Sequence, residues 1–358
     1  MRLVRAGFAG GKTQRLVSLL LLVTTLSACG GGTSTGTSTP GAGGKAEPST
    51  LLLVSYSVTK RAYDKILPKF QADWKRRTGQ ELEVKTSYGG SGSQTRAVID
   101  GLEADVVTLA LPADVIKLEK ARLVKPGWEK ELPDDSSITH SVVTLLTRPG
   151  NPKAIKGWSD LAKPGLAVIT TNPKTSGSAR WNVLGLWGSV SRSGGSDQAA
   201  ETFLTSVYRN VVNMPKDARE ASDAFLNRGQ GDVLLTYENE ALLAARQAEG
   251  KPPTLVVPPL NIRIDGPVAV VDRNVERHGS RRAAEALARY LQGEEAQEIL
   301  ASEGFRPVNA AVWNRRKADF APVSTLFSAA DLGGWPTIDR TFFATGGLWD
   351  RIAAARAR

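Results

Sequence analysis

Residues 51–111 have the sequence LLLVSYSVTKRAYDKILPKFQADWKRRTGQELEVKTSYGGSGSQTRAVIDGLEADVVTLAL, in which strand and helix patterns alternate. The apolar run Leu51 to Tyr56 predicts a buried strand, and the apolar residues that follow it recur at helical spacing as far as Trp74. A second strand, a glycine-rich turn, a second helix and the buried strand 106–111 complete this region. Such alternation predicts α/β layers with largely parallel sheets.

The same alternation continues through the rest of the chain, and we find no internal repeat. Further strands are predicted at 166–170, 233–237, 254–257 and 268–271, with helices at about 179–186, 281–291 and 294–302. The pattern therefore predicts an α/β architecture along most of the sequence.

Length and composition are those of an ordinary globular protein. The chain has 358 residues, of which 41% are hydrophobic and 23% charged, so two domains are expected and disordered or fibrous classes are excluded. The net charge is +10. Without residues 1–28 it falls to +6, because 42 Lys and Arg then stand against 36 Asp and Glu. No basic run is interleaved with aromatic residues, so the sequence does not indicate a nucleic-acid partner.

The N-terminus is typical of an exported lipoprotein. Residues 1–15 are basic, and residues 16–26 are mostly apolar but too few to cross a membrane. Leu26 to Cys29 (LSAC) then match the bacterial lipobox, in which the cysteine is lipidated and becomes the new N-terminus. We predict a signal peptide over 1–28 and a lipid anchor at Cys29, in the periplasm or cell envelope. The alternative is a plain signal peptide with an incidental cysteine.

The segment after this cysteine is predicted to be a flexible linker. Apart from Cys29, Lys45 and Glu47, residues 29–50 are all Gly, Ser, Thr, Pro or Ala. Such a composition cannot bury enough apolar surface to order itself. Cys29 is also the single cysteine, which excludes an intramolecular disulfide and any multi-cysteine metal site.

Three polar segments, at 88–94, 173–181 and 214–220, combine small residues with the start of a predicted helix. The first N–H groups of a helix lack intrahelical partners, and the helix dipole is positive there, so such ends can bind anions. The alternative is that Ser and Gly simply cap helices and form turns. Together the three segments favour an anionic ligand.

The sequence also resembles the periplasmic sulfate-binding proteins, whose close relatives bind thiosulfate. The resemblance covers essentially everything after the linker. It is carried by residues 54–111, LPDDSS (132–137), RPGNPKAIKGWSDLAKPG (148–165), NPKTSGSARWN (172–182), GDVLLTYENEALL (231–243) and LGGWPTIDRTFFATGG (332–347).

The resemblance implies the two-lobed periplasmic-binding-protein fold of type II, with the ligand in a cleft between two α/β lobes joined by crossing strands. One lobe would contain residues 51–141 and 262–358, and the other residues 142–261. The implied function is high-affinity sulfate binding and delivery to the membrane permease of an ATP-driven (ABC) importer. It implies a monomer without metal or cofactor, and no enzyme activity.

The resemblance also implies which residues bind the ligand. They would act mainly through backbone N–H groups, with hydroxyl donors at Ser176 and Tyr237. The positions are Ser57, Ser91, Ser176, Gly177, Ser178, Ala218 and Tyr237. Three of them depart from the family pattern: Ser57 replaces the usual Asp, Ser178 replaces a common Gly, and Tyr237 replaces the Trp of sulfate binders or the Phe of thiosulfate binders.

Other interpretations remain open at this point. Thiosulfate or mixed specificity is the first, because of Tyr237. A periplasmic hydrolase of sulfate or phosphate esters is the second, although no nucleophile with a base and no set of metal ligands is evident. The two histidines, His140 and His278, are far apart in sequence and are expected at the surface or at a hinge. A purely structural lipoprotein would leave the helix-opening turns unexplained.

Overall fold

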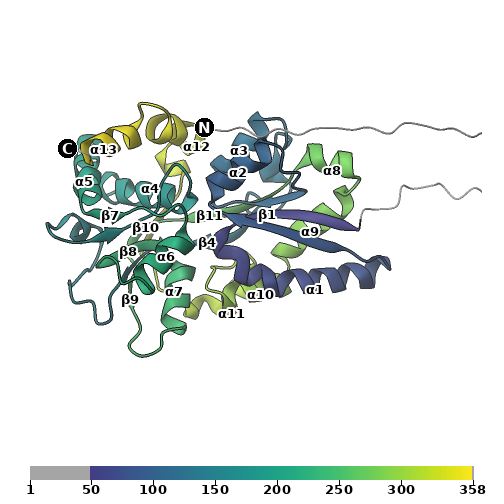
Figure 1. Cartoon of the computed structure of the whole chain (residues 1–358), viewed down its shortest axis with the longest axis horizontal. Helices are drawn as coiled ribbons and strands as arrows, with labels where there is room; N and C mark the ends of the chain where they lie inside the picture. Colours follow the sequence, from purple (N-terminus) through teal and green to yellow (C-terminus); the bar gives the residue numbers. More distant parts are fainter. Residues whose placement is uncertain (1–48, 357–358) are drawn as a thin grey trace, which may run out of the picture. The chain divides into compact units, whose positions relative to one another are not determined.

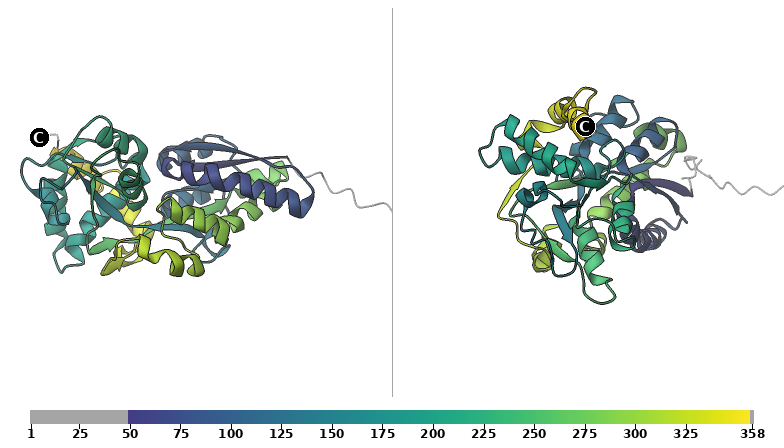
Figure 2. Two further views of the ribbon diagram at one scale, coloured as in Figure 1. Left: turned by 90° about the horizontal axis from the view of Figure 1, so that it is seen from below. Right: turned by 60° about the vertical axis from the view of Figure 1, so that its left-hand side comes forward.

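Two five-stranded sheets form the framework of residues 49–356, which are the residues that the computed structural model describes. The first sheet has the order β2-β1-β3-β11-β4 and the second the order β7-β6-β8-β5-β9. We call each sheet with its covering helices a lobe, and Figure 2 shows the two lobes side by side. The predicted signal peptide, Cys29 and nearly all of the linker lie outside the described residues.

The first lobe begins with three parallel strands. They are β1 (Thr50–Tyr56), β2 (Glu83–Gly89) and β3 (Val106–Thr108), extended by the antiparallel strands β11 (Ile264–Val270) and β4 (Ser137–Ser141). Its helices are α1 (Lys60–Thr78), α2 (Ser91–Ile99), α3 (Pro112–Lys120), α8 (Asp272–His278), α9 (Arg281–Gln292), α10 (Glu294–Ser302) and α11 (Ala310–Arg316). In Figure 1, α1 and α10 run along the same side of this sheet.

The second lobe is built in the same way. Its strands are β5 (Val143–Thr147), β6 (Val168–Ile169), β7 (Val211–Asn213), β8 (Val233–Tyr237) and β9 (Thr254–Val256), with β6 parallel to β7 and β8. Its helices are α4 (Gly177–Ser191), α5 (Asp197–Arg209), α6 (Ala218–Leu226) and α7 (Glu238–Arg246). The predicted α/β class is therefore confirmed, but the sheets are mixed and not largely parallel, because each has two parallel and two antiparallel strand pairings.

Helix α4 owes its central position in the second lobe to its small residues. Its residues from Gly177 to Gly188 are buried apart from Arg180, and a Cβ atom at Gly188 would lie 2.1 Å from the ring of Phe327. The ring of Trp158 also packs against Gly185, where it would lie 3.0 Å from a Cβ atom added to that glycine. Glycine lets these rings approach the backbone of α4 closely, which helps to bury the helix in the lobe.

The chain passes between the lobes at two points where one strand follows another almost directly, and the C-terminal segment crosses a third time. Strand β4 leads into β5 through Val142, and β10 (Leu260–Ile262) leads into β11 through Arg263. The buried Asn261 amide joins the two connections, because its Oδ1 accepts from the N–H of Val143 at 3.2 Å and its Nδ2 donates to the same residue's carbonyl at 2.9 Å. These connections lie close to residues 141–142 and 261–262, the predicted boundaries between the lobes.

The C-terminal segment differs from the expected division of the lobes. Strand β12 (Thr325–Phe327) pairs with β10, and the helices α12 (Gly334–Ile338) and α13 (Leu348–Arg356) follow it. Helix α13 packs on α5 through the edge-to-face rings of Trp349 and Tyr208, with centroids 5.0 Å apart. The segment thus crosses to the second lobe (Figure 1), where Phe342 also meets Trp187 of α4 edge to face, with centroids 5.1 Å apart. The boundaries predicted for the other segments remain a prediction.

Ion pairs surround the connections between the lobes. His140 lies on β4 between the carboxylates of Asp134, at 2.6 Å, and Asp265, at 2.9 Å. Burial alone would lower the pKa of His140, but these two carboxylates raise it to about 9. Arg306 and Glu238 form a buried bidentate pair, with N–O distances of 2.6 and 2.9 Å. His140 therefore lies beside the connection from β4 to β5. Within residues 49–356, no group of His, Cys, Asp and Glu side chains could hold a metal ion.

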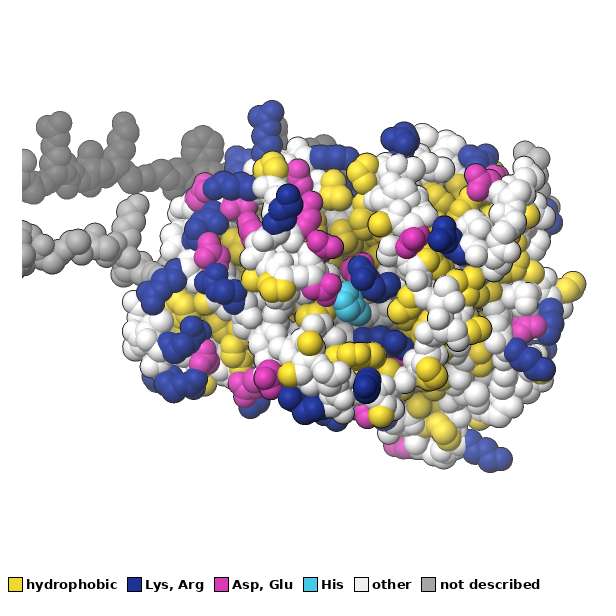
Figure 3. Space-filling model, turned by 180° about the vertical axis from the view of Figure 1, so that it is seen from behind, with side chains coloured by type: hydrophobic (Ala, Val, Ile, Leu, Met, Phe, Trp, Pro, Cys, Tyr) yellow, Lys and Arg dark blue, Asp and Glu magenta, His cyan; other side chains and the backbone are white. Residues whose placement is uncertain are grey.

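Short helical turns complete the described elements. They are η1 (Ser57–Thr59), η2 (Trp128–Lys130), η3 (Trp158–Ala162), η4 (Lys317–Asp319), η5 (Ala330–Leu332) and the π-helical η6 (Asp339–Phe343). On the face that Figure 3 shows, acidic and basic side chains are interspersed. Within residues 49–356, no helix is both long and apolar enough to span a membrane.

Candidate functional site

The predicted ligand-binding residues come together at the starts of five helical segments. Each of them begins such a segment, follows its first residue or precedes it directly. Ser57 starts η1, Ser91 starts α2, Gly177 and Ser178 start α4 after Ser176, Ala218 starts α6, and Tyr237 precedes α7. All seven line one cavity, together with Tyr56, Val58, Gly89, Gly90, Ala110 and Asp217. Residues far apart in sequence therefore share one site.

The cavity is small and lies between the lobes. Its cavity volume is about 10 Å³, whereas sites for drug-sized ligands measure roughly 300–1,000 Å³. The first lobe contributes Ser57 and Ser91, and the second contributes the remaining predicted residues. The cavity is therefore far too small for a drug-sized molecule.

Helix N-termini supply the positive potential of the cavity. Among the described residues that line it, none is Lys, Arg or His. Asp217 is the one lining carboxylate in this set, and its Oδ1 caps α6 by accepting from the N–H of Glu220 at 3.0 Å. Free N–H groups and aligned peptide dipoles favour an anion without a formal counter-charge. The prediction that these polar turns open helices is confirmed, with α4 starting two residues earlier than expected.

Ser176 does not act as an ordinary cap of α4. Its backbone is extended, with φ −112° and ψ 130°, as at a helix N-cap. However, its side chain makes no capping hydrogen bond to the helix, and the residue is buried beside the cavity. The hydroxyl is therefore available to donate to a ligand.

Two further hydroxyl groups are buried at the cavity without a partner. The Tyr237 phenol and the Ser178 hydroxyl make no hydrogen bond within residues 49–356. Burial raises the pKa of the Tyr237 phenol well above its usual value, and the nearby Tyr56 phenol and Asp114 carboxylate raise it further. Tyr237 is thus a neutral donor at any physiological pH. Its ring meets that of Tyr56 edge to face, with centroids 6.2 Å apart.

The lobes touch directly around the cavity. The N–H of Gly92 donates to the carbonyl of Thr175 at 3.1 Å, and Trp181 Nε1 donates to the carbonyl of Ala110 at 2.7 Å. Glycine is required at this contact, since a Cβ atom at Gly90 would lie 2.6 Å from the Thr175 carbonyl oxygen. A Cβ atom at Gly177 would similarly lie 2.5 Å from that of Ala110. The structure therefore has a closed cleft.

Sequence reasoning missed Asp114, which fixes one wall of the site. Its Oδ2 accepts from the Ser91 hydroxyl at 2.7 Å, and that hydroxyl also accepts from the N–H of Ala110 at 3.0 Å. Burial alone would raise the pKa of Asp114, but the cations Lys117 and Arg180 hold it below its usual value. Because its hydroxyl already donates to Asp114, the backbone N–H is the donor that Ser91 can still offer to a ligand. No sequence motif marks Asp114, since it follows an apolar strand at the start of an unremarkable helix.

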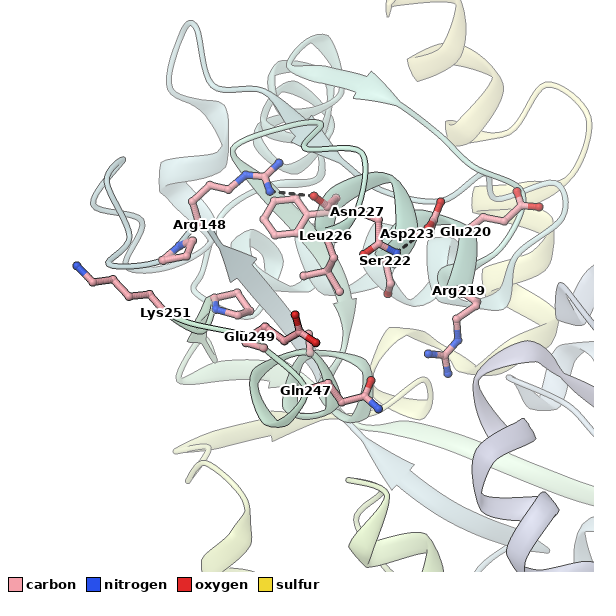
Figure 4. Close-up of a pocket in the computed structure, with 15 residues that line it drawn as sticks. Arg148, Arg219, Glu220, Ser222, Asp223, Leu226, Asn227, Gln247, Glu249 and Lys251 are labelled. Carbon is pink, nitrogen blue, oxygen red and sulfur yellow. Dashed lines mark hydrogen bonds between the residues drawn. The ribbon is translucent and has the colours of Figure 1, made fainter.

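The cations that flank the predicted turns are engaged elsewhere. Arg219 pairs with the buried Glu240 at 3.0 Å, and Arg180 pairs with Asp339 at 3.3 Å. Arg219 also lines a larger open groove on the second lobe (Figure 4), where Arg148 lies over the ring of Phe225 at 3.9 Å from its centroid. These cations brace the loops and do not line the cavity at the helix N-termini.

Comparisons with known proteins agree with this fold. Residues 51–306 match the family model for bacterial extracellular solute-binding proteins. A sulfate-binding protein of Synechococcus elongatus is 51% identical over 336 residues, which cover 94% of each chain. A thiosulfate-binding protein of Pseudomonas aeruginosa is 38% identical over 313 residues, 87% of this chain and 94% of that protein.

A solved structure is similar over most of the described fold. The sulfate-binding protein SubI from Mycobacterium tuberculosis has a TM-score of 0.76 and 37% identity, and the match covers 83% of this chain and all of that one. The architecture is that of type II periplasmic binding proteins, as the resemblance implied. The chain belongs to the bacterial extracellular solute-binding protein family.

Proposed function

We propose that the protein binds sulfate outside the cytoplasmic membrane and delivers it to the permease of an ATP-driven (ABC) importer. The observation that carries the proposal is the convergence of five helical N-termini on one small cavity that no described Lys, Arg or His lines. The relatives named as sulfate-binding proteins, at 51% and 37% identity, support the same ligand.

The chemistry of the cavity suits a fully deprotonated oxyanion. Sulfate near neutral pH carries no proton, so all its oxygens accept hydrogen bonds and none donates. The proposed contacts are donors: the N–H groups of Ser57, Ser91, Gly177, Ser178 and Ala218, and the hydroxyls of Ser176 and Tyr237. Hydrogen bonds to a charged group are stronger than neutral ones, and their number offsets the cost of dehydrating the ion.

Closure of the two lobes converts binding into a signal for transport. Each lobe contributes donors, so an ion held by both stabilises the closed arrangement over an open one. We propose that the permease recognises this closed state and that the receptor acts as a monomer. Binding without catalysis is part of the proposal, and the family, which consists of solute-binding proteins, supports it.

Thiosulfate is the second candidate ligand, since a thiosulfate-binding relative is 38% identical over most of its length. Tyr237 distinguishes the two ligands in our proposal. Its phenol is a buried donor without a partner, and an oxygen of sulfate is a better acceptor for it than the terminal sulfur of thiosulfate. We therefore place sulfate first.

The hydroxyl of Ser176 gives the most direct test of this site. A hydrogen bond to a charged group contributes about 1.5–3 kcal/mol, so Ser176→Ala should weaken sulfate binding by roughly 10- to 150-fold. Ser189→Ala is the matched control on the same helix, because that hydroxyl donates to the Leu186 carbonyl at 2.7 Å and does not line the cavity. Equal affinities of the two variants, measured by calorimetry, would exclude Ser176 as a ligand.

Anchoring through Cys29 is a further part of the proposal, supported by the lipobox sequence at residues 26–29. Cys29→Ala should leave the protein unprocessed or release it into the soluble fraction, because the thiol that carries the lipid is gone. Cell fractionation and metabolic labelling with a fatty acid measure both effects. A processed variant that stays in the membrane fraction would contradict the anchor.

A further inference from the structure

An arginine side chain of the first lobe reaches the second lobe at the rim of the cleft. Arg96 lies in the last turn of α2, and its Nη1 donates to the carbonyl of Lys174 at 3.0 Å. Lys174 belongs to the second lobe, in the segment between β6 and α4. Because donor and acceptor lie in different lobes, this hydrogen bond can form only when the cleft closes.

The guanidinium of Arg96 is also held by its own lobe. Its Nη2 donates to the hydroxyl of Ser93, one turn earlier in α2, at 3.2 Å. Within residues 49–356, Arg96 forms no ion pair with a carboxylate. The guanidinium is a planar fork of donors, so less conformational freedom is lost per hydrogen bond once its direction is fixed. Arg96 is therefore oriented toward its acceptor before closure, and no acidic side chain competes for it.

The acceptor belongs to a tight turn that leads into the proposed binding residues. The N–H groups of Thr175 and Ser176 both donate to the Asn172 carbonyl, at 3.1 and 2.9 Å, which fixes this turn within the second lobe. The Thr175 carbonyl accepts from the N–H of Gly92 at 3.1 Å. Two consecutive carbonyls, those of Lys174 and Thr175, are thus bound by α2 directly before Ser176. Contacts of α2 therefore hold this turn against the first lobe.

We propose that Arg96 is a positioning residue that latches the closed cleft and sets the rate at which the bound anion leaves. The inference rests on the proposed sulfate-binding function, and Arg96 itself does not line the cavity. Release requires the lobes to separate, so a contact made only in the closed state slows release and does not change the encounter of the ion with the open cleft. The Gly92 contact acts through the main chain, whereas a single substitution removes the Arg96 contact.

Stopped-flow tryptophan fluorescence of the mature protein with sulfate tests the latch. Trp181 Nε1 donates to the Ala110 carbonyl across the cleft, so this ring reports closure. The observed rate plotted against sulfate concentration gives the association rate constant as its slope and the dissociation rate constant as its intercept. Arg96→Met should raise the dissociation rate constant by about 2- to 10-fold, as expected for one lost hydrogen bond. The association rate constant and the urea midpoint of the ligand-free protein should not change.

Two further variants separate the latch from a general effect of charge. Lys85→Met removes an exposed cation of the same lobe, whose Nζ lies 3.8 Å from Glu83, and it should leave both rate constants at their native values. Ser93→Ala should raise the dissociation rate constant by a smaller factor than Arg96→Met, because it only frees the guanidinium. For the same reason it should add nothing to Arg96→Met. Calorimetry should show the same factors in the equilibrium dissociation constant.

Other outcomes would overturn the proposal. A native dissociation rate constant in Arg96→Met would show that the contact does not retain the ion. A change confined to the association rate constant would assign Arg96 to long-range attraction of the anion, and an equal effect of Lys85→Met would show that any cation of the lobe suffices. The native protein is the reference: if it binds no sulfate, the proposed function fails, whereas native binding with unaltered release from Arg96→Met rejects only the latch.

Discussion

Gly177→Ala should reduce sulfate affinity by roughly 10²- to 10⁴-fold without destabilising the protein. The added methyl group would lie 2.5 Å from Ala110 Cβ and 2.8 Å from a methyl of Leu111, both in the opposite lobe. The cleft then cannot close, and the ligand loses the contacts that we assign to Ser57 and Ser91. Two hydrogen bonds to a charged group contribute about 3–6 kcal/mol together, which gives the expected factor.

The stability of the same variant separates closure from folding. Alanine is at least as favourable as glycine in a helix, and the clash arises only when the lobes meet. We therefore expect an unchanged or slightly higher urea midpoint for the ligand-free protein. Gly157→Ala is the control, because its Cβ atom would meet nothing within 4 Å and its φ of 179° is extended. Full affinity in Gly177→Ala would mean that closure is not needed for binding.

Arg306→Met should lower the free energy of unfolding by about 3–5 kcal/mol, because it leaves the Glu238 carboxylate buried without its partner. The guanidinium donates to both Glu238 oxygens, at 2.6 and 2.9 Å, and to the Ala321 carbonyl at 2.7 Å. Because Glu238 directly follows Tyr237, which lines the cavity, the pair also lies next to the proposed binding site. Urea unfolding of the ligand-free protein measures the loss.

An exposed ion pair provides the matched control for this variant. Arg351 makes a similar bidentate contact with Glu201, at 2.9 Å for both bonds, but its side chain is 53% exposed. Arg351→Met should therefore cost less than about 1 kcal/mol. Adding Glu238→Leu to Arg306→Met should recover most of the lost stability, because the unpaired charge is removed. Comparable losses for the two single variants would contradict the importance of burial.

The regular elements and most of the candidate site could be predicted because their signals are local. Apolar runs predict the strands β1, β3 and β8, and apolar residues at helical spacing predict α1 and α9. The turns before α2, α4 and α6 contain small polar residues, which predict helix starts. The resemblance to a known family then placed these turns around one ligand, which local patterns cannot do.

What the sequence did not predict depends on contacts between distant residues. Asp114 supports Ser91 across 23 positions of sequence, and no pattern around it distinguishes it from a solvated acid. The C-terminal helices pack on α5 of the second lobe through Trp349 and Tyr208. Their place in the sequence, after residue 261, had assigned them to the first lobe. The unpaired state of the Ser178 hydroxyl likewise appears only when all its neighbours are known.

The central claim is that the cavity binds sulfate through donors alone. Calorimetric titration of the native protein at neutral pH with sulfate, thiosulfate, phosphate and molybdate tests it most directly. We predict saturable one-to-one binding of sulfate, weaker binding of thiosulfate and little response to phosphate, because hydrogen phosphate needs an acceptor that the proposed contacts do not offer. Absence of heat with sulfate, or phosphate binding as tight as sulfate binding, would contradict the account.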